Sequence, residues 1–200
     1  MKRQAKPRDQ LKVARVSIQQ NLERILEENH RLLQSLSDKK VEDFIQRILE
    51  ARAIFFCAQG RSGFILRCFC MRLMHLGYQV YYCGETVTPA IEPGDMLVVL
   101  SGSGETPSTL EAIKVAKKRE AFTYAIVANL KSRIASSVDR YIHLAGTTKL
   151  RRDGEPHSLQ MGGSLFEQAV FIFLEAIILT LHQERLEGVD SFSPKHAVIE

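Results

Sequence analysis

The sequence lacks the features that mark a secreted or membrane protein. No apolar stretch reaches the ~18 residues that a helix needs to cross a bilayer. The N-terminus, MKRQAKPRDQ, is basic but lacks the apolar core of a secretory signal. Neither an internal repeat nor a low-complexity segment is present. These absences predict a protein that does not bind a membrane.

Cysteine is scarce, and its spacing is unlike that of a metal site. None of the four cysteines belongs to a Cys-x-x-Cys pair, the usual signature of zinc ligands. All four lie within apolar segments: Cys57, Cys68, Cys70 and Cys83. This pattern indicates reduced, mostly buried cysteines of a cytoplasmic protein and predicts no bound metal.

The net charge of the sequence is also small. The sequence has 27 Lys and Arg residues against 23 Asp and Glu, a net charge of +4, which gives no indication of nucleic-acid binding. Its 200 residues suffice for one domain with a substantial core but are too few for two large ones. With 45% apolar and 25% charged residues, the composition is that of a soluble globular protein.

The N-terminal part has the apolar periodicity of helices. Between residues 11 and 36, apolar residues recur every three or four positions, which predicts a helical arm. Ser37 is placed to cap a second helix that runs to about residue 49. We expect the arm, residues 1–36, to pack on the domain or on a neighbouring subunit.

Beyond the arm, short continuous apolar runs alternate with helical segments. Five runs are predicted to be strands: 53–58, 78–83, 96–100, 121–129 and 140–146. Such runs are typical of parallel strands covered on both faces, and their alternation with helices predicts an α/β fold. We therefore predict a three-layer αβα sandwich with a five-stranded parallel sheet.

The remaining segments complete a single domain. Helices are predicted over residues 64–76, from residue 107, around 132–137 and over 164–187. The domain then spans residues 37–187, and a tail of residues 188–200 follows. The last helix is too apolar for an ordinary exposed helix, so we expect it to be buried between the subunits of a homo-oligomer.

Two glycine-rich loops, QGRSG (59–63) and SGSGET (101–106), each follow a predicted strand and precede a helix. In open α/β sheets, ligands bind at the carboxyl ends of the strands, where such loops lie. A helix N-terminus attracts anions, glycines let the backbone approach them, and hydroxyls donate hydrogen bonds to their oxygens. Neither loop matches a nucleotide-binding fingerprint. Together the loops predict a site for a small phosphorylated ligand.

A purely structural role for these loops is an alternative. Thr106 followed by Pro107 is a typical helix start, and Ser62 is likewise placed to cap the helix after the first loop. Ser101 and Ser103, however, exceed what capping needs. We therefore favour ligand binding.

Several motifs resemble those of one enzyme family. They are GRSG, MRLMHLGYQVYYCGETVTPAI, SGSGET, GSLFEQ and the terminal KHAVIE. In these motifs the sequence resembles the 6-phospho-3-hexuloisomerases, which belong to the sugar-isomerase (SIS) domain proteins. The resemblance runs from about residue 40 to the end, with departures from the usual motifs at AQGRSG and QMGGSLFEQ.

The resemblance implies a fold, a reaction and a site. It implies a tetramer of αβα sandwiches that interconverts D-arabino-hex-3-ulose 6-phosphate and D-fructose 6-phosphate in the ribulose monophosphate pathway. It implies neither a metal nor an organic cofactor. By similarity, residues of the two loops would hold the phosphate or nearby hydroxyls: Gly60, Arg61, Ser62, Ser101, Gly102, Ser103, Gly104 and Thr106.

Glu167 is the candidate for the base of such a reaction. Moving a carbonyl between adjacent carbons requires a group that takes a proton and returns it to the neighbouring carbon, and Glu or His suits this task. Ser164 and Glu167 also fit an S-x-x-E capping box, a role that needs no catalysis. The resemblance places the base of SIS isomerases at Glu167 and therefore favours catalysis.

His196 and Glu85 are further candidates. By similarity, His196 in the tail would reach an active site, that of a neighbouring subunit, to assist proton transfer or to position the sugar. Glu85, in GETVTP, is placed to contact sugar hydroxyls, although a turn at a strand end accounts for it equally well.

Two other functions are compatible with these motifs. One is a different SIS isomerase, such as one acting on an aldose phosphate, and the other is a sugar-phosphate-sensing module without catalysis. A bacterial regulator of the second kind would normally carry a DNA-binding helix-turn-helix ahead of the domain. Residues 1–50 contain only the predicted arm and one further helix, so we favour the isomerase.

Overall fold

Five short strands form the sheet that the apolar runs predict. The computed structural model describes residues 18–147 and 157–186. Its strands are β1 Ile54–Ala58, β2 Val80–Tyr82, β3 Met96–Ser101, β4 Phe122–Val127 and β5 Arg140–His143. All neighbouring strands pair in parallel, in the order β2-β1-β3-β4-β5. The predicted five-stranded parallel sheet is thus confirmed.

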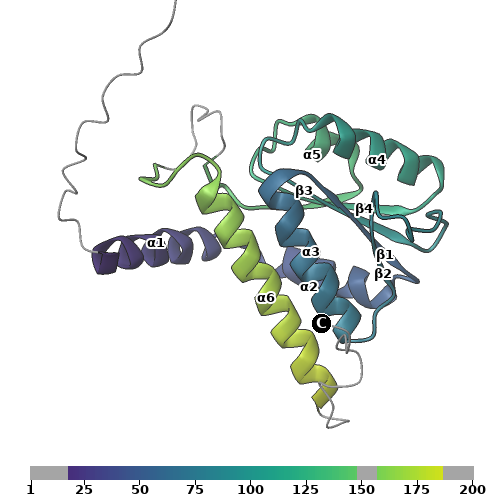
Figure 1. Cartoon of the computed structure of the whole chain (residues 1–200), viewed down its shortest axis with the longest axis horizontal. Helices are drawn as coiled ribbons and strands as arrows, with labels where there is room; N and C mark the ends of the chain where they lie inside the picture. Colours follow the sequence, from purple (N-terminus) through teal and green to yellow (C-terminus); the bar gives the residue numbers. More distant parts are fainter. Residues whose placement is uncertain (1–17, 148–156, 187–200) are drawn as a thin grey trace, which may run out of the picture.

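Helices cover both faces of this sheet. They are α1 Ile18–Leu33, α2 Asp38–Glu50, α3 Gly60–His75, α4 Pro107–Lys118, α5 Arg133–Ser137 and α6 Ser164–Leu186. Helices α4 and α5 lie on one face, and α2, α3 and α6 lie on the other, whereas α1 extends away from the sheet (Figure 1). This arrangement confirms the three-layer αβα sandwich.

Strand β3 shows why the apolar runs are continuous. Successive side chains of a strand point to opposite faces of the sheet. Met96, Val98 and Leu100 pack into the core beneath α2, α3 and α6, while Leu97 and Val99 pack beneath α4 and α5. Because both faces are covered, all residues of β3 are buried and no polar position alternates with the apolar ones.

Helix α6 belongs to the core despite its length and composition. In the described part of the chain, it is the one helix long and apolar enough to cross a membrane, with a mean hydropathy of 1.8 over Ser164–Glu184. The expectation that no stretch reaches such a length is therefore wrong, because an apolar helix can include occasional residues such as Glu175. In this structure 61% of its most apolar window is buried inside the protein, as in the core helix of a folded domain.

The order of the strands fixes where a ligand can enter. From β1 the chain moves outward to the edge strand β2 and then crosses back to β3 on the other side of β1. The connections that leave β1 and β3 therefore run to opposite faces of the sheet, and a crevice opens between them at the carboxyl ends of these strands. The loops at 59–63 and 101–106 flank this crevice.

The arm helix α1 is tied to α6 and to the segment before it. Asn29 Nδ2 donates a hydrogen bond to Gln168 Oε1 at 2.9 Å. The carboxylate of Glu28 accepts hydrogen bonds from Ser158 Oγ at 2.6 Å and from Gln160 Nε2 at 2.8 Å. Burial opposes ionisation of Glu28, but these hydrogen bonds outweigh it and lower the pKa. The arm thus holds the segment that leads into α6.

Candidate active site

A cavity of about 200 Å³ opens where β1 and β3 end. Its lining comes from the two glycine-rich loops, from the segment after β5 and from the start of α6. The lining residues are 59–62, 100–103, Thr106, Thr147, Gly163, Phe166 and Glu167. The two loops that the sequence singles out therefore meet in one cavity.

The first loop is the first turn of α3 rather than a linker before it. The helix begins at Gly60, four residues earlier than the sequence predicts, and Gln59 occupies its N-cap position. The proposal that Ser62 caps this helix is therefore wrong, because Ser62 lies inside the first turn and lines the cavity. Gly60 has a φ of +59°, a conformation that favours glycine.

The buried side chain of Tyr82 packs against this first turn of α3. Tyr82 Oη donates a hydrogen bond to Ala58 O at 2.8 Å, and a Cβ on Gly63 would lie only 3.0 Å from that hydroxyl. Burial raises the pKa of Tyr82, although the nearby Arg67 guanidinium opposes this shift. The hydroxyl therefore stays neutral, and Gly63 lets α3 pack closely on the end of β1.

The second loop is held by hydrogen bonds within itself. Ser101 Oγ accepts from the Gly104 N–H at 3.0 Å and lies 3.1 Å from Thr106 Oγ1. Thr106 does occupy the N-cap position of α4, with Pro107 after it, but its side chain makes no capping hydrogen bond. Its hydroxyl is turned toward Ser101 instead, so capping does not account for the side chain.

Glu105 ties this loop to α5. Its carboxylate accepts hydrogen bonds from the Arg133 N–H at 3.0 Å and from Arg133 Nε at 2.6 Å. Gly104, with a φ of +67°, packs against Ser132, and a Cβ at this position would clash with the Ser132 side chain. The loop therefore has its shape before any ligand binds.

Glu167 lies at the opposite wall of the cavity, in the first turn of α6. Its side chain is 8% exposed, and Oε2 lies 2.9 Å from Arg61 Nε. Arg61 also donates to Ser164 Oγ at 3.2 Å. The capping-box alternative is wrong, because Ser164 is already helical and the Glu167 N–H donates to Gly163 O. The carboxylate is held by an arginine from α3.

The structure does not gather every candidate from the sequence at this site. Gly104 is absent from the cavity lining, and its N–H is taken by Ser101. Glu85 also does not line the cavity and forms a 2.9 Å ion pair with Arg67 of α3. His196 lies outside the described residues. Arg61 lines the cavity, where it contacts Glu167.

Five lining residues are not among the sequence candidates. Gln59, Gly163 and Phe166 lie within recognised motifs, Leu100 belongs to β3, and Thr147 follows β5. The signal for Thr147 was available, because β5 is a third strand whose carboxyl end faces the same edge of the sheet. The segment from residue 146 onward, however, has the composition of a loop, which by itself indicates no site.

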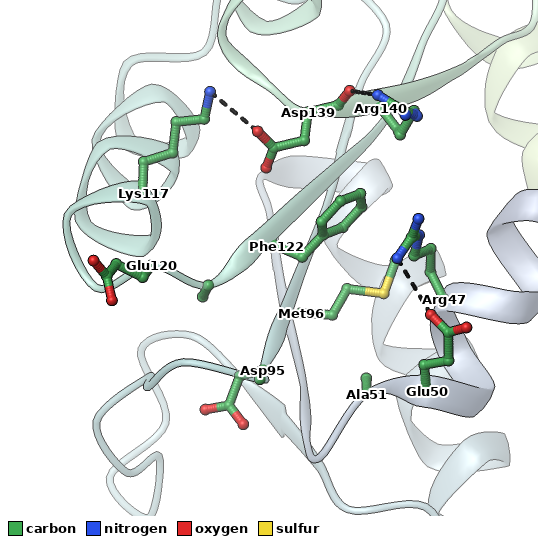
Figure 2. A pocket seen from close by; sticks show the side chains of 12 residues that line it. Arg47, Glu50, Ala51, Asp95, Met96, Lys117, Glu120, Phe122, Asp139 and Arg140 are labelled. Carbon is green, nitrogen blue, oxygen red and sulfur yellow. Dashed lines mark hydrogen bonds and ion pairs between the residues drawn. The ribbon is translucent and has the colours of Figure 1, made fainter.

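A larger hollow of about 630 Å³ lies at the amino ends of β3, β4 and β5 (Figure 2). Four of its charged side chains pair with one another. Lys117 Nζ lies 3.4 Å from Asp139 Oδ1, and Arg47 Nη1 lies 3.2 Å from Glu50 Oε2. Within residues 18–147 and 157–186, no group of three or more His, Cys, Asp or Glu side chains is placed to hold a metal ion.

The smaller cavity has the chemistry of a sugar-phosphate site. The N-terminus of α4 and the hydroxyls of Ser101, Ser103 and Thr106 suit an anion. Glu167, on the other wall, can accept and return a proton. An anion site and a proton carrier in one cavity fit a small phosphorylated substrate that undergoes proton transfer.

Comparison with known proteins agrees with this chemistry. Residues 47–149 match the SIS domain family. The chain is 35% identical to the 3-hexulose-6-phosphate isomerase of Bacillus subtilis, over 84% of this chain and 89% of that protein. It is 33% identical to the 3-hexulose-6-phosphate isomerase of Mycobacterium gastri, over 95% of each chain.

Solved structures share the fold. A Methanococcus jannaschii protein, whose crystal structure was used to infer a 3-hexulose-6-phosphate isomerase function, matches with a TM-score of 0.72 at 35% identity, over 86% of this chain and 94% of that one. The chain therefore belongs to the SIS-domain proteins. Within them it belongs to the family of the 3-hexulose-6-phosphate isomerases, which are also called 6-phospho-3-hexuloisomerases.

Proposed function

We propose that this protein interconverts D-arabino-hex-3-ulose 6-phosphate and D-fructose 6-phosphate. The observation that carries the proposal is the buried carboxylate of Glu167, which lines the same cavity as the SGSGET loop. Membership of the isomerase family selects this reaction among those that an anion site and a carboxylate can support.

The phosphate is held at the N-terminus of α4. Ser101, Ser103 and Thr106 orient their hydroxyls toward it, and Ser62 contributes from the first turn of α3. Ser101 Oγ and Thr106 Oγ1 are already in contact, so little ordering is required when the ligand binds. The sugar then extends across the cavity toward Glu167.

Glu167 moves the proton between two neighbouring carbons. Its carboxylate takes the proton from C2 of the 3-ketose, and the C3 carbonyl oxygen becomes the second oxygen of a 2,3-enediol. The same group returns that proton to C3, while the proton of the C2 hydroxyl passes to the C3 oxygen and C2 becomes the carbonyl, so no redox partner is needed. Arg61 orients the carboxylate through its ion pair. We further propose that His196 of a neighbouring subunit assists this transfer or positions the sugar.

The test supplies the substrate directly. Hexulose 6-phosphate is made enzymatically from formaldehyde and ribulose 5-phosphate, and the formation of fructose 6-phosphate is followed. A folded preparation is expected to turn over without added metal or organic cofactor. If no fructose 6-phosphate forms, the isomerase proposal is wrong. If His196→Ala has wild-type kinetics, the tail of residues 188–200 contributes only to packing.

We also propose a homotetramer. A groove of about 490 Å³ lies between α1, α3 and α6, and apolar side chains dominate its lining. Exposed apolar residues on these helices include Leu26 at 65%, Phe64 at 70% and Phe171 at 40%. A second copy that covers these residues would remove this apolar surface from water. Sedimentation or light scattering of the purified chain measures the subunit number.

The compartment and pathway complete the proposal. All four cysteines are free, as expected of a protein in the reducing cytoplasm. The expectation that most of them are buried is wrong, because Cys68 is exposed and Cys70 and Cys83 are half-buried. The reaction would serve the ribulose monophosphate pathway, in which hexulose 6-phosphate carries carbon from formaldehyde. Activity in the soluble fraction of disrupted cells, and its absence from the membrane fraction, would support the cytoplasmic location.

A further inference from the structure

Thr147 is a buried hydroxyl at the active-site cavity that the proposed mechanism does not use. It is 5% exposed, and Oγ1 has no hydrogen-bond partner within the described residues. It nevertheless lines the cavity that Glu167 lines. A buried hydroxyl without a hydrogen-bond partner is unfavourable, so a ligand in the cavity that supplies this partner would be stabilised there.

A tight turn fixes where this hydroxyl lies. After β5, the Leu144 N–H donates to Val127 O at 3.0 Å, and the Gly146 N–H donates back to Leu144 O at 2.7 Å. A Cβ on Gly146 would lie 2.7 Å from Phe166 Cα, so the chain touches the backbone of α6 there. Thr147 is thus held beside the turn of helix that carries Glu167.

The SGSGET loop contacts Phe166 as well, through the ring of this phenylalanine. A Cβ on Gly102 would lie 3.1 Å from Phe166 Cδ1, so Gly102 touches the ring, whereas Gly146 touches the backbone. The residue before Thr147 therefore contacts the turn of α6 that carries Glu167, whereas Gly102 contacts the ring that projects from this turn. This arrangement favours a contact between Thr147 and the sugar carbons near Glu167 over a contact with the phosphate.

We infer that Thr147 Oγ1 donates a hydrogen bond to an oxygen on the reacting carbons of the sugar phosphate, where negative charge develops in the enediol step. This inference rests on the proposed isomerase function and adds a residue to it. While Glu167 removes the proton from C2, the adjacent carbonyl oxygen gains charge, and a fixed donor stabilises it. The hydroxyl stays protonated throughout, so the step balances with Glu167 as the proton carrier.

The test replaces Thr147 by valine, which keeps the shape and removes the hydroxyl. We expect kcat to fall by about 100-fold, as for the loss of one donor to a developing oxyanion. KM for the sugar phosphate should rise by a smaller factor than kcat falls, because the hydrogen bond is weaker to the bound sugar phosphate than to the enediol, and Thr147→Ser should recover most of the rate. The melting temperature of Thr147→Val should equal or exceed that of the wild type, because an unpartnered hydroxyl has been removed. Thr109→Val is the control, because Thr109 is fully buried but does not line the cavity.

Calorimetry separates this inference from its alternatives. Inorganic phosphate should bind wild type and Thr147→Val equally, whereas fructose 6-phosphate should bind the variant more weakly. Equal loss for both ligands would make Thr147 a phosphate contact and overturn the inference, as would an unchanged kcat. If the wild type shows no turnover, the isomerase proposal fails by itself. The two binding comparisons then decide about Thr147, because a selective loss for the sugar phosphate supports a sugar contact and any other result excludes it.

Discussion

The two ends of the sheet carry very different hollows. The one at the amino ends of the strands is larger, about 630 Å³, and four of its charged side chains are matched in the ion pairs Lys117–Asp139 and Arg47–Glu50 (Figure 2). The one at the carboxyl ends is about 200 Å³, and it combines loop hydroxyls, a helix N-terminus and the carboxylate of Glu167. Chemical groups that are available to a ligand, rather than volume, distinguish the active site.

Helix direction explains this difference. In a parallel sheet with crossover helices, the helix N-termini gather at the carboxyl ends of the strands and the C-termini gather at the amino ends. Arg47 in the last turn of α2 and Lys117 in the last turn of α4 complement helix C-termini at the amino end. The same geometry leaves the positive helix ends of α3 and α4 at the catalytic cavity.

Removing the carboxylate should have the largest effect. Glu167→Gln should lower kcat by about 10²- to 10⁴-fold, because the proposed general base is lost while the shape is kept. Binding of fructose 6-phosphate should persist, which calorimetry measures. Glu50→Gln, at the amino-end hollow, is the matched control and should retain wild-type kinetics. Near-normal turnover by Glu167→Gln would assign the base elsewhere.

Weakening the phosphate loop should have the next largest effect. Ser101→Ala should lower kcat/KM by about 10- to 100-fold, the usual range for one hydrogen bond to a charged group. The loss should appear mainly in KM, since the phosphate does not react. Ser136→Ala in α5 serves as the control, because its hydroxyl is exposed and bonds only to Arg133 O among the described residues. If Ser101→Ala and Ser136→Ala have the same kinetics, the loop has only a structural role.

The amino end should affect stability instead. Burial opposes ionisation of Asp139, but hydrogen bonds from Thr123 and the charge of Lys117 outweigh it and lower the pKa. Asp139→Asn should cost about 1 kcal/mol in the free energy of unfolding at neutral pH, a value discounted for partial exposure of the carboxylate. Turnover should be unchanged.

The pH dependence of this loss in the free energy of unfolding follows from the direction of the Asp139 pKa shift. A lowered pKa in the folded state stabilises the protein above the ordinary value of about 4. This contribution is lost as the pH falls through the lowered pKa. Denaturant unfolding at neutral and at acid pH should therefore show the wild type and Asp139→Asn converging in acid. A difference that grows in acid would contradict the assignment.

The smallest effect is expected for Arg140, which lines the amino-end hollow and bonds only to Asp139 O among the described residues. Arg140→Ala should change the free energy of unfolding by less than about 0.5 kcal/mol and leave KM unchanged. Unfolding curves and steady-state kinetics measure both. A raised KM would show that the larger hollow takes part in substrate binding and would remove the distinction between the two ends.

Local sequence patterns are misleading at the starts of α3 and α6, although they place the N-cap positions Ser37 of α2 and Thr106 of α4 correctly. Ser62 looked like a cap, but α3 begins at Gly60 and places that serine in its first turn. Ser164 and Glu167 matched a capping box, yet Ser164 is the first helical residue and Glu167 pairs with Arg61. Residue spacing alone does not decide the first helical residue, because helix ends vary by one or two residues.

The sequence by itself determined the sheet and the two glycine-rich loops at the carboxyl ends of its strands. Continuous apolar runs such as 96–100 follow from burial on both faces, and the glycines and hydroxyls of the loops suit the approach of an anion. Only the tertiary structure brought Arg61 to Glu167 and set the hydroxyl of Thr147 beside the first turn of α6. These residues are remote along the chain, and their meeting depends on how the strands are ordered and how α6 packs, which local patterns do not encode.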